Sequence, residues 1–251
     1  MLTLELFIIA FALLLGGVIK GLSGIGLPMV ALPILTTQVS IQDAILLLTL
    51  PILFSNLIQS KEINTDHIKQ PWLLALLATL LSGMTLGSFL LFSHQHWILL
   101  ITAISLTVYS LIALSGFHIK IKEESRIKSA AFTGSIAGFI GGGTSLYGWP
   151  LVIYTSSLNL SKKDFISTIS AIYLIAHLYF IINLYIQNML TKQSITFSLL
   201  ASLPVFTGIF IGQKFNKSIN QKIFYKLIQL LIFIGGILLF FQIPKHFWSS
   251  I

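Results

Sequence analysis

Two glycine-rich stretches hold the polar groups that could bind a ligand within an otherwise apolar chain. The first reads GGVIKGLSGIGLPMV over residues 16–30, and the second reads GFIGGGTSLYGWPLV over residues 138–152. In each stretch a proline follows glycines and a serine, so a helix should break at the glycines and restart at the proline, which needs no amide hydrogen there. The uncovered N–H groups at a helix start bind anions through hydrogen bonds and the helix dipole. These stretches therefore predict a binding site for a small anion.

The candidate ligands come from both stretches and from two further apolar segments. Lys20 is the only Lys or Arg well inside an apolar segment. Placing a charge there costs about 2.5–3.5 kcal/mol on insertion scales, so Lys20 is expected to face a cavity, the alternative being that it snorkels to an interface. His177 aligns with Asn56 in the internal repeat described below. Its side chain is expected either to contact the ligand or to join two helices by a hydrogen bond. We expect substrate binding by Lys20, Gly21, Ser23, Gly24, Gly26, Pro28, Asn56, Gly143, Thr144, Ser145, Tyr147, Gly148, Pro150 and His177.

The composition indicates what kind of protein must position these residues. The chain has 251 residues, of which 55% are hydrophobic and 9% charged, with a mean hydropathy of +0.93. A soluble domain carries roughly a quarter charged residues, so a soluble enzyme and a disordered protein are excluded. The absence of cysteine excludes disulfides, thiolate catalysis and cysteine metal sites. The formal charge of +8 sits mostly in short segments between apolar runs, which favours membrane topology and anionic headgroups over nucleic-acid binding.

Eight continuous apolar segments predict an all-α polytopic membrane protein. They span 4–35, 43–59, 72–93, 97–115, 129–157, 165–188, 195–213 and 223–243. The first four resemble the last four at offsets of 121–125 residues. The matching pairs are Gly16/Gly138, Gly21/Gly143, Ser23/Ser145, Gly26/Gly148, Pro28/Pro150, Val30/Val152, Ser40/Ser161, Asp43/Asp164, Asn56/His177, Gly83/Gly208 and Gly87/Gly212. The pattern predicts a first membrane repeat over 1–117, a basic loop over 118–128 and a second repeat over 129–251, each repeat starting with a broken segment.

The broken segments are either kinked crossings or re-entrant hairpins, and the basic residues favour hairpins. If every segment crosses, one side holds 8 basic residues and the other holds 6. The side with 6 consists of Lys162, Lys163, Lys214, Lys217, Lys222 and Lys226. If both broken segments are hairpins, these join Lys61, Lys69, Lys120, Lys122, Arg126 and Lys128, and only Lys192 and Lys245 remain opposite. A split of 12 against 2 is what the positive-inside rule expects. Three full crossings per repeat then make the repeats inverted, with the breaks expected to meet at the repeat interface.

Other polar and small residues have structural explanations. Gly83, Gly87, Gly208 and Gly212 are expected to let helices pack closely. Asp43 and Asp164 each follow a serine by three residues, which is the spacing of a helix capping box. His94 and His96 flank a short loop, and neither a metal site nor a cofactor is predicted. Every carboxylate lies at a segment end or in a loop, which disfavours proton coupling through a buried carboxylate, the alternative being titration of Lys20 or His177. No acid or His accompanies Ser23 or Ser145 locally, which disfavours an intramembrane hydrolase. No nucleotide-binding loop is present, which disfavours use of ATP.

The duplicated blocks KGLSGIGLPMV at 20–30 and GGTSLYGWPLV at 142–152 resemble the two glycine-rich motifs of the TauE/SafE sulfite exporters, also called the TSUP family. The resemblance covers nearly the whole chain. It implies a multi-pass secondary transporter of sulfite, organosulfonates or other small organic anions in the bacterial inner membrane, with no enzymatic activity. The sequence departs from symmetry where Lys20 aligns with Gly142 and Gly24 with Leu146. An anion channel, and a membrane-embedded enzyme or subunit without transport activity, are the alternatives.

Overall fold

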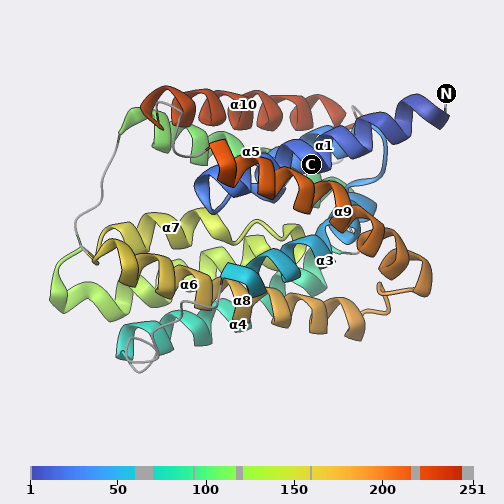
Figure 1. The fold of residues 1–251 in the computed structure, drawn as a ribbon. Helices are drawn as coiled ribbons and strands as arrows, with labels where there is room; N and C mark the ends of the chain where they lie inside the picture. Colours follow the sequence, from blue (N-terminus) through green and yellow to red (C-terminus); the bar gives the residue numbers. More distant parts are fainter. Residues whose placement is uncertain are drawn as a thin grey trace. The chain divides into compact units, whose positions relative to one another are not determined.

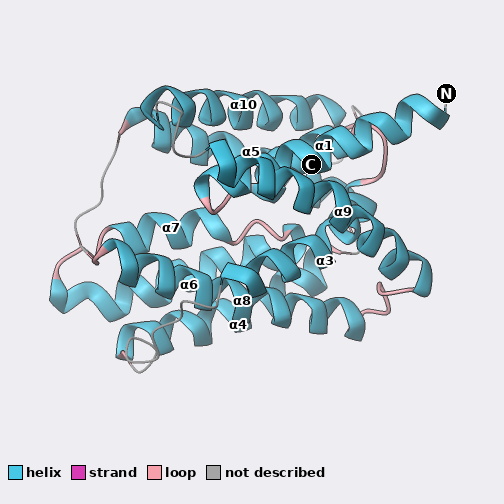
Figure 2. Ribbon diagram, viewed as in Figure 1, coloured by secondary structure: helices cyan, strands magenta, loops and turns pink. Residues whose placement is uncertain are grey.

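A computed structural model describes residues 2–59, 70–92, 94–116, 121–158, 160–215 and 221–244 (Figure 1). Throughout these ranges the regular elements are helices (Figure 2). Five of the basic residues that entered the topology argument, Lys61, Lys69, Lys120, Lys217 and Lys245, lie outside the described residues. The prediction of an all-α chain is confirmed over the described ranges.

The helices follow the predicted apolar segments closely. They are α1 (Leu2–Ser23), α2 (Leu27–Leu35), α3 (Ile41–Gln59), α4 (Pro71–Leu91), α5 (Gln95–Ser115), α6 (Arg126–Thr144), α7 (Gly148–Ser156), α8 (Lys162–Ile186), α9 (Lys192–Phe215) and α10 (Gln221–Gln242). Both predicted breaks are present, between α1 and α2 and between α6 and α7. Among the described helices, α1, α3, α4, α5, α8 and α9 contain stretches long and apolar enough to cross a membrane.

Local side-chain chemistry explains where several helices start. The backbone N–H of Asp43 donates to the Ser40 hydroxyl at 3.1 Å, and the Ser40 hydroxyl donates to the Asp43 carboxylate at 2.6 Å. Ser161 and Asp164 repeat this arrangement with the same distances. The capping interpretation of both aspartates is confirmed. Pro28 and Pro150 lie in the first turns of α2 and α7, as the missing amide hydrogen predicts.

The predicted basic loop over 118–128 is partly helical in the structure. The segment expected to be a basic loop over 118–128 is helical from Glu123 onward, as a 3₁₀ turn (η3, Glu123–Ser125) that leads directly into α6 at Arg126. The Arg126 guanidinium lies 3.8 Å from the Glu123 carboxylate, so a pair of opposite charges sits at this helix start. Arg126 and Lys128 therefore belong to the first turn of α6. Apolar periodicity alone placed the start of the segment three residues later.

The described chain forms two compact units. Unit 1 comprises Met1–Pro51, His94–Phe117 and Leu190–Ile251, and unit 2 comprises Ile52–Ser93 and His118–Met189. Unit 1 therefore holds α1, α2, α5, α9, α10 and the first part of α3, whereas unit 2 holds the rest of α3 together with α4, α6, α7 and α8. Each unit combines helices from both predicted repeats. The compact units are thus a different division of the chain from the repeat boundaries expected from the sequence.

Glycines let α1 and α9 pack closely within unit 1. A Cβ on Gly17 would overlap the backbone carbonyl of Val205, and a Cβ on Gly21 would overlap that of Ile209. Both contacts move four residues along both helices, so α1 and α9 run parallel. Gly208 and Gly212 lie equally close to the backbone of α1. The predicted packing role of these two glycines is confirmed.

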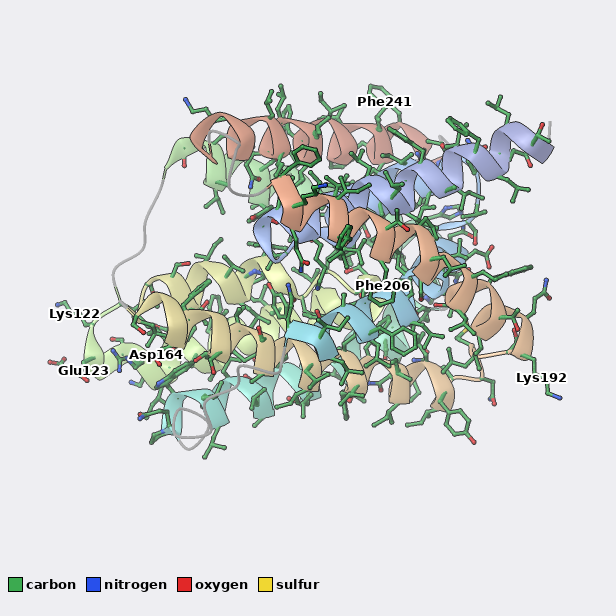
Figure 3. The ribbon with its side chains drawn as sticks, viewed as in Figure 1. Lys122, Glu123, Asp164, Lys192, Phe206 and Phe241 are labelled. Carbon is green, nitrogen blue, oxygen red and sulfur yellow. The ribbon has the colours of Figure 1, made fainter. Side chains whose placement is uncertain are left out.

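The α5 and α10 pair of unit 1 is antiparallel. A Cβ on Gly236 of α10 would lie 3.1 Å from the Ala103 carbonyl oxygen and 3.0 Å from the Thr107 nitrogen. Gln229, seven residues earlier on α10, donates through Nε2 to the Tyr109 hydroxyl at 3.4 Å. Contacts that move back along α10 therefore move forward along α5. On the outer face of α10, Phe241 is 83% exposed and points away from the other helices of unit 1 (Figure 3), as expected for a side chain in contact with lipid.

Unit 2 contains a second close, parallel pair, α4 with α6. The backbone of Gly134 contacts that of Leu76, and the backbone of Gly138 contacts that of Leu80. On the facing helix, a Cβ on Gly83 would lie 2.7 Å from the Ser135 carbonyl oxygen, and one on Gly87 would overlap the Phe139 carbonyl. The packing role predicted for Gly83 and Gly87 is confirmed. At these contacts the backbones of α4 and α6 lie so close together that only glycine, which has no Cβ, can be accommodated.

Candidate functional site

The first break reverses the direction of the chain. A Cβ on Gly16 of α1 would lie 2.9 Å from the Leu27 side chain and 3.1 Å from the Ala31 Cβ, which shows that α2 runs back along α1. Gly24 and Gly26 have φ of 80° and 97°, in the left-handed region that side chains disfavour. The SGIG sequence at 23–26 therefore supplies glycine at the two positions where the reversal needs a left-handed backbone.

The second break reverses the chain in the same way, although it uses a serine at the left-handed position. Ser145 has φ of 62°, a conformation that costs a residue with a Cβ about 1–2 kcal/mol. The Tyr154 hydroxyl on α7 donates to the Arg126 carbonyl at the start of α6, at 2.9 Å, so α7 returns toward the end at which α6 begins. Glu123 before α6 and Asp164 in the first turn of α8 lie at one end of unit 2 (Figure 3).

The polar groups of the first break are held by the local backbone. The Ser23 hydroxyl lies 2.7 Å from the Ile19 carbonyl oxygen and 2.6 Å from the Ile25 carbonyl oxygen, and it accepts from the Ile25 N–H at 3.4 Å. These contacts stabilise the turn itself. Lys20 lies in the last turn of α1, and its side chain is only 5% exposed.

The second break holds a buried hydroxyl that the described protein groups leave unpartnered. Ser145 is 4% exposed, and its Oγ has no hydrogen-bond partner. The neighbouring Thr144 is used locally, because its hydroxyl donates to the Ile140 carbonyl at 2.7 Å and accepts from the Leu146 N–H at 3.1 Å. A buried donor without a partner costs about 1–3 kcal/mol. The hydroxyl of Ser145 is therefore the group of this break that is available to a ligand.

A buried polar cluster adjoins Ser145 in unit 2. The Tyr147 hydroxyl lies 3.0 Å from His177 Nδ1, and it also hydrogen-bonds the Asn56 side chain. All three side chains are at most 3% exposed. The structure thus brings together three predicted site residues that come from three separate segments of the chain. These contacts give the Tyr147 hydroxyl two polar neighbours inside an apolar unit.

Tyr173 is a residue of this cluster that the sequence did not single out. Its hydroxyl donates to the Gly148 carbonyl at 3.1 Å, and its ring meets the Tyr147 ring edge-on at a centroid distance of 5.7 Å. Tyr173 lies one helical turn before His177 on α8, so both side chains lie on the same face of the helix. Only that four-residue spacing to a singled-out histidine could have pointed to Tyr173.

The predicted site residues divide between the two units. Unit 1 contains Lys20, Gly21, Ser23, Gly24, Gly26 and Pro28, and unit 2 contains Asn56, Gly143, Thr144, Ser145, Tyr147, Gly148, Pro150 and His177. Within the part of the chain that the structure describes, no three His, Asp or Glu side chains come together as metal ligands. The described carboxylates are at helix starts or in η3, namely Glu5, Asp43, Glu123, Glu124 and Asp164.

Comparison with known proteins gives the family. No curated protein and no solved structure matches the chain. The model of the family described as "Sulfite exporter TauE/SafE" matches residues 8–239, a range that includes both breaks and at least part of every helix from α1 to α10. Since this range covers most of the 251 residues, the chain, a multi-pass integral membrane protein, belongs to the TauE/SafE sulfite exporter family of membrane transporters.

Proposed function

We propose that this protein is a secondary transporter of a small anion, such as sulfite, an organosulfonate or a related organic acid, in the bacterial inner membrane. The observation that carries the proposal is the second break, where the unpartnered Ser145 hydroxyl stands three residues before the start of α7. A buried hydroxyl and the free N–H groups of a helix start are donors without a compensating acceptor. An anionic oxygen is the ligand that satisfies both.

The charges of the chain support an anion as the substrate. Lys20 places a basic group beside the first break, and the described carboxylates belong to helix starts or to η3 and not to the break segments themselves. A site for a cation would instead need acidic side chains or a ring of carbonyl oxygens at the breaks. Each break therefore contributes groups suited to negative charge, with a lysine in unit 1 and neutral donors in unit 2.

The directions of the helices support re-entrant breaks and inverted repeats. If every apolar segment crossed the membrane once, α5 would be the fourth crossing and α10 the eighth, and both would run in the same direction. With each break as a re-entrant hairpin, α5 is the third full crossing and α10 the sixth, and they run in opposite directions. Because the first break precedes both helices, this comparison depends on the second break alone. The contacts of Gly236 and Gln229 make α5 and α10 antiparallel. The reversals at both breaks agree with this arrangement, as does the 12 to 2 distribution of basic residues.

The function is tested by measuring sulfite uptake into proteoliposomes that contain the purified protein, with sulfoacetate and acetate in parallel. We expect sulfite flux that saturates with concentration, because a carrier has a limited number of sites and a conformational step in each cycle. Flux of acetate but not of sulfite would support a carrier whose substrate is a carboxylate. Flux that rises without saturation would favour the channel alternative. Absence of flux for all three anions would contradict the proposal and favour a membrane-embedded enzyme or subunit.

A further inference from the structure

Two side chains of α8 hold the second break from outside. Tyr173 donates to the Gly148 carbonyl at 3.1 Å, and His177 Nδ1 lies 3.0 Å from the Tyr147 hydroxyl. The two α8 residues are one turn apart, and their two partners are consecutive residues of the break. The His177 ring also stacks on Phe180 at a centroid distance of 5.8 Å, which fixes its orientation. The position of the break is therefore tied to α8 at two adjacent points.

The first break is held differently. Its serine is bonded to the backbone of Ile19 and Ile25, inside the same turn. Two glycines, Gly24 and Gly26, give it the left-handed backbone without side-chain strain. The second break places Ser145 itself in that conformation, and its hydroxyl makes no bond to the turn. The two serines correspond in the sequence repeat, yet only Ser145 has its hydroxyl available.

We propose that Ser145, and not Ser23, donates the hydroxyl hydrogen bond to the transported anion, and that Tyr173 and His177 are positioning residues that hold Ser145 in place through Gly148 and Tyr147. This inference rests on the proposed function and assigns unequal roles to the two breaks within it. Ser23 is a structural residue of its turn. Tyr173 and His177 act on the anion only through the break that they hold.

The first test compares the two serines in the sulfite uptake assay. Ser145→Gly removes the hydroxyl while glycine suits φ of 62°, so this variant should fold at least as well as the wild type. We expect its KM for sulfite to rise about tenfold or more, since a hydrogen bond to a charged group is lost. Ser145→Ala should raise KM similarly. Ser23→Ala should keep the wild-type KM, and size-exclusion chromatography in detergent checks that this variant is folded.

The second test separates positioning from direct contact. Tyr173→Phe should raise KM several-fold in the wild-type background and should add nothing in the Ser145→Gly background, because its effect passes through Ser145. Tyr179→Phe is the matched control: it removes a hydroxyl from the same helix, one that is bonded to Thr85 of α4 at 2.8 Å and not to a residue of the break. It should leave KM unchanged. The double variant of His177→Gln with Ser145→Gly should likewise be no worse than Ser145→Gly alone.

Several outcomes would overturn this inference while leaving the proposed function intact. Wild-type flux that saturates, together with an unchanged KM in Ser145→Gly, would remove Ser145 as the donor. A rise in KM for Ser23→Ala equal to that of Ser145→Gly would contradict the unequal roles. A full additional effect of Tyr173→Phe in the Ser145→Gly background would contradict positioning through Ser145. Absence of flux in the wild type would instead be a failure of the proposed function itself.

Discussion

Replacing Gly138 with leucine is expected to prevent the protein from folding. Gly138 lies where α6 meets α4, and a Cβ there would overlap the Leu80 carbonyl oxygen and lie 2.9 Å from the Met84 nitrogen. The obstacles are backbone atoms, so a side chain cannot rotate away and the two helices must separate. Overpacking a core usually costs about 1–3 kcal/mol, and separating this pair should cost more, against a total stability of about 5–15 kcal/mol.

The measurement is the yield of monodisperse protein in detergent and its thermal unfolding temperature. Ser135→Leu is the matched control, because it introduces the same residue one turn earlier on the same helix, at an exposed position. We expect the control to behave like the wild type and Gly138→Leu to give little or no monodisperse protein. A Gly138→Leu variant with the yield and unfolding temperature of the control would contradict the close contact between α4 and α6.

Replacing Lys20 with alanine is expected to give the largest loss of transport among variants that still fold. Lys20 is 5% exposed and lies in the last turn of α1, immediately before the first break. A positive charge shielded from water attracts an anion far more strongly than a surface charge does. We expect kcat/KM for sulfite to fall at least tenfold, which corresponds to about 1.4 kcal/mol.

Lys192→Ala is the control for this variant. Lys192 is exposed at the start of α9, so its replacement removes the same charge from the chain at a position in contact with solvent or headgroups. It should change kcat/KM little. Equal activity of the two variants would remove Lys20 from the anion site, and its role would then be the ordinary one of a basic residue near the negative end of the α1 dipole.

The broken segments could be predicted because their cause is local. Glycines that adopt left-handed backbone and a proline in a first turn are visible within the SGIGLP sequence at 23–28 itself. The same holds for the capping boxes at Ser40 and Ser161. These features depend on residues within a few positions of each other, which a single sequence displays directly.

The contents of the two units could not be predicted, because they depend on contacts between distant segments. Glycines such as Gly83 and Gly208 indicate that another helix packs closely at these positions, but they do not indicate which helix it is. The difference between the roles of Ser23 and Ser145 could not be predicted either. The repeat predicts equivalent roles for Ser23 and Ser145. Their roles differ because Ser145 itself adopts the left-handed backbone conformation. Glycines in the first break indicate this conformation in the sequence, whereas a serine does not.

The proposed inverted repeats and the proposed anion site both require that the two breaks are re-entrant. The chain contains no cysteine, so single variants Lys122→Cys and Lys192→Cys each carry one thiol, at positions that are exposed in the structure. Each is treated with a membrane-impermeant maleimide in intact and in permeabilised cells. We predict that Lys192→Cys is labelled in intact cells and that Lys122→Cys is labelled only after permeabilisation. Labelling of both from the same side would contradict the re-entrant arrangement.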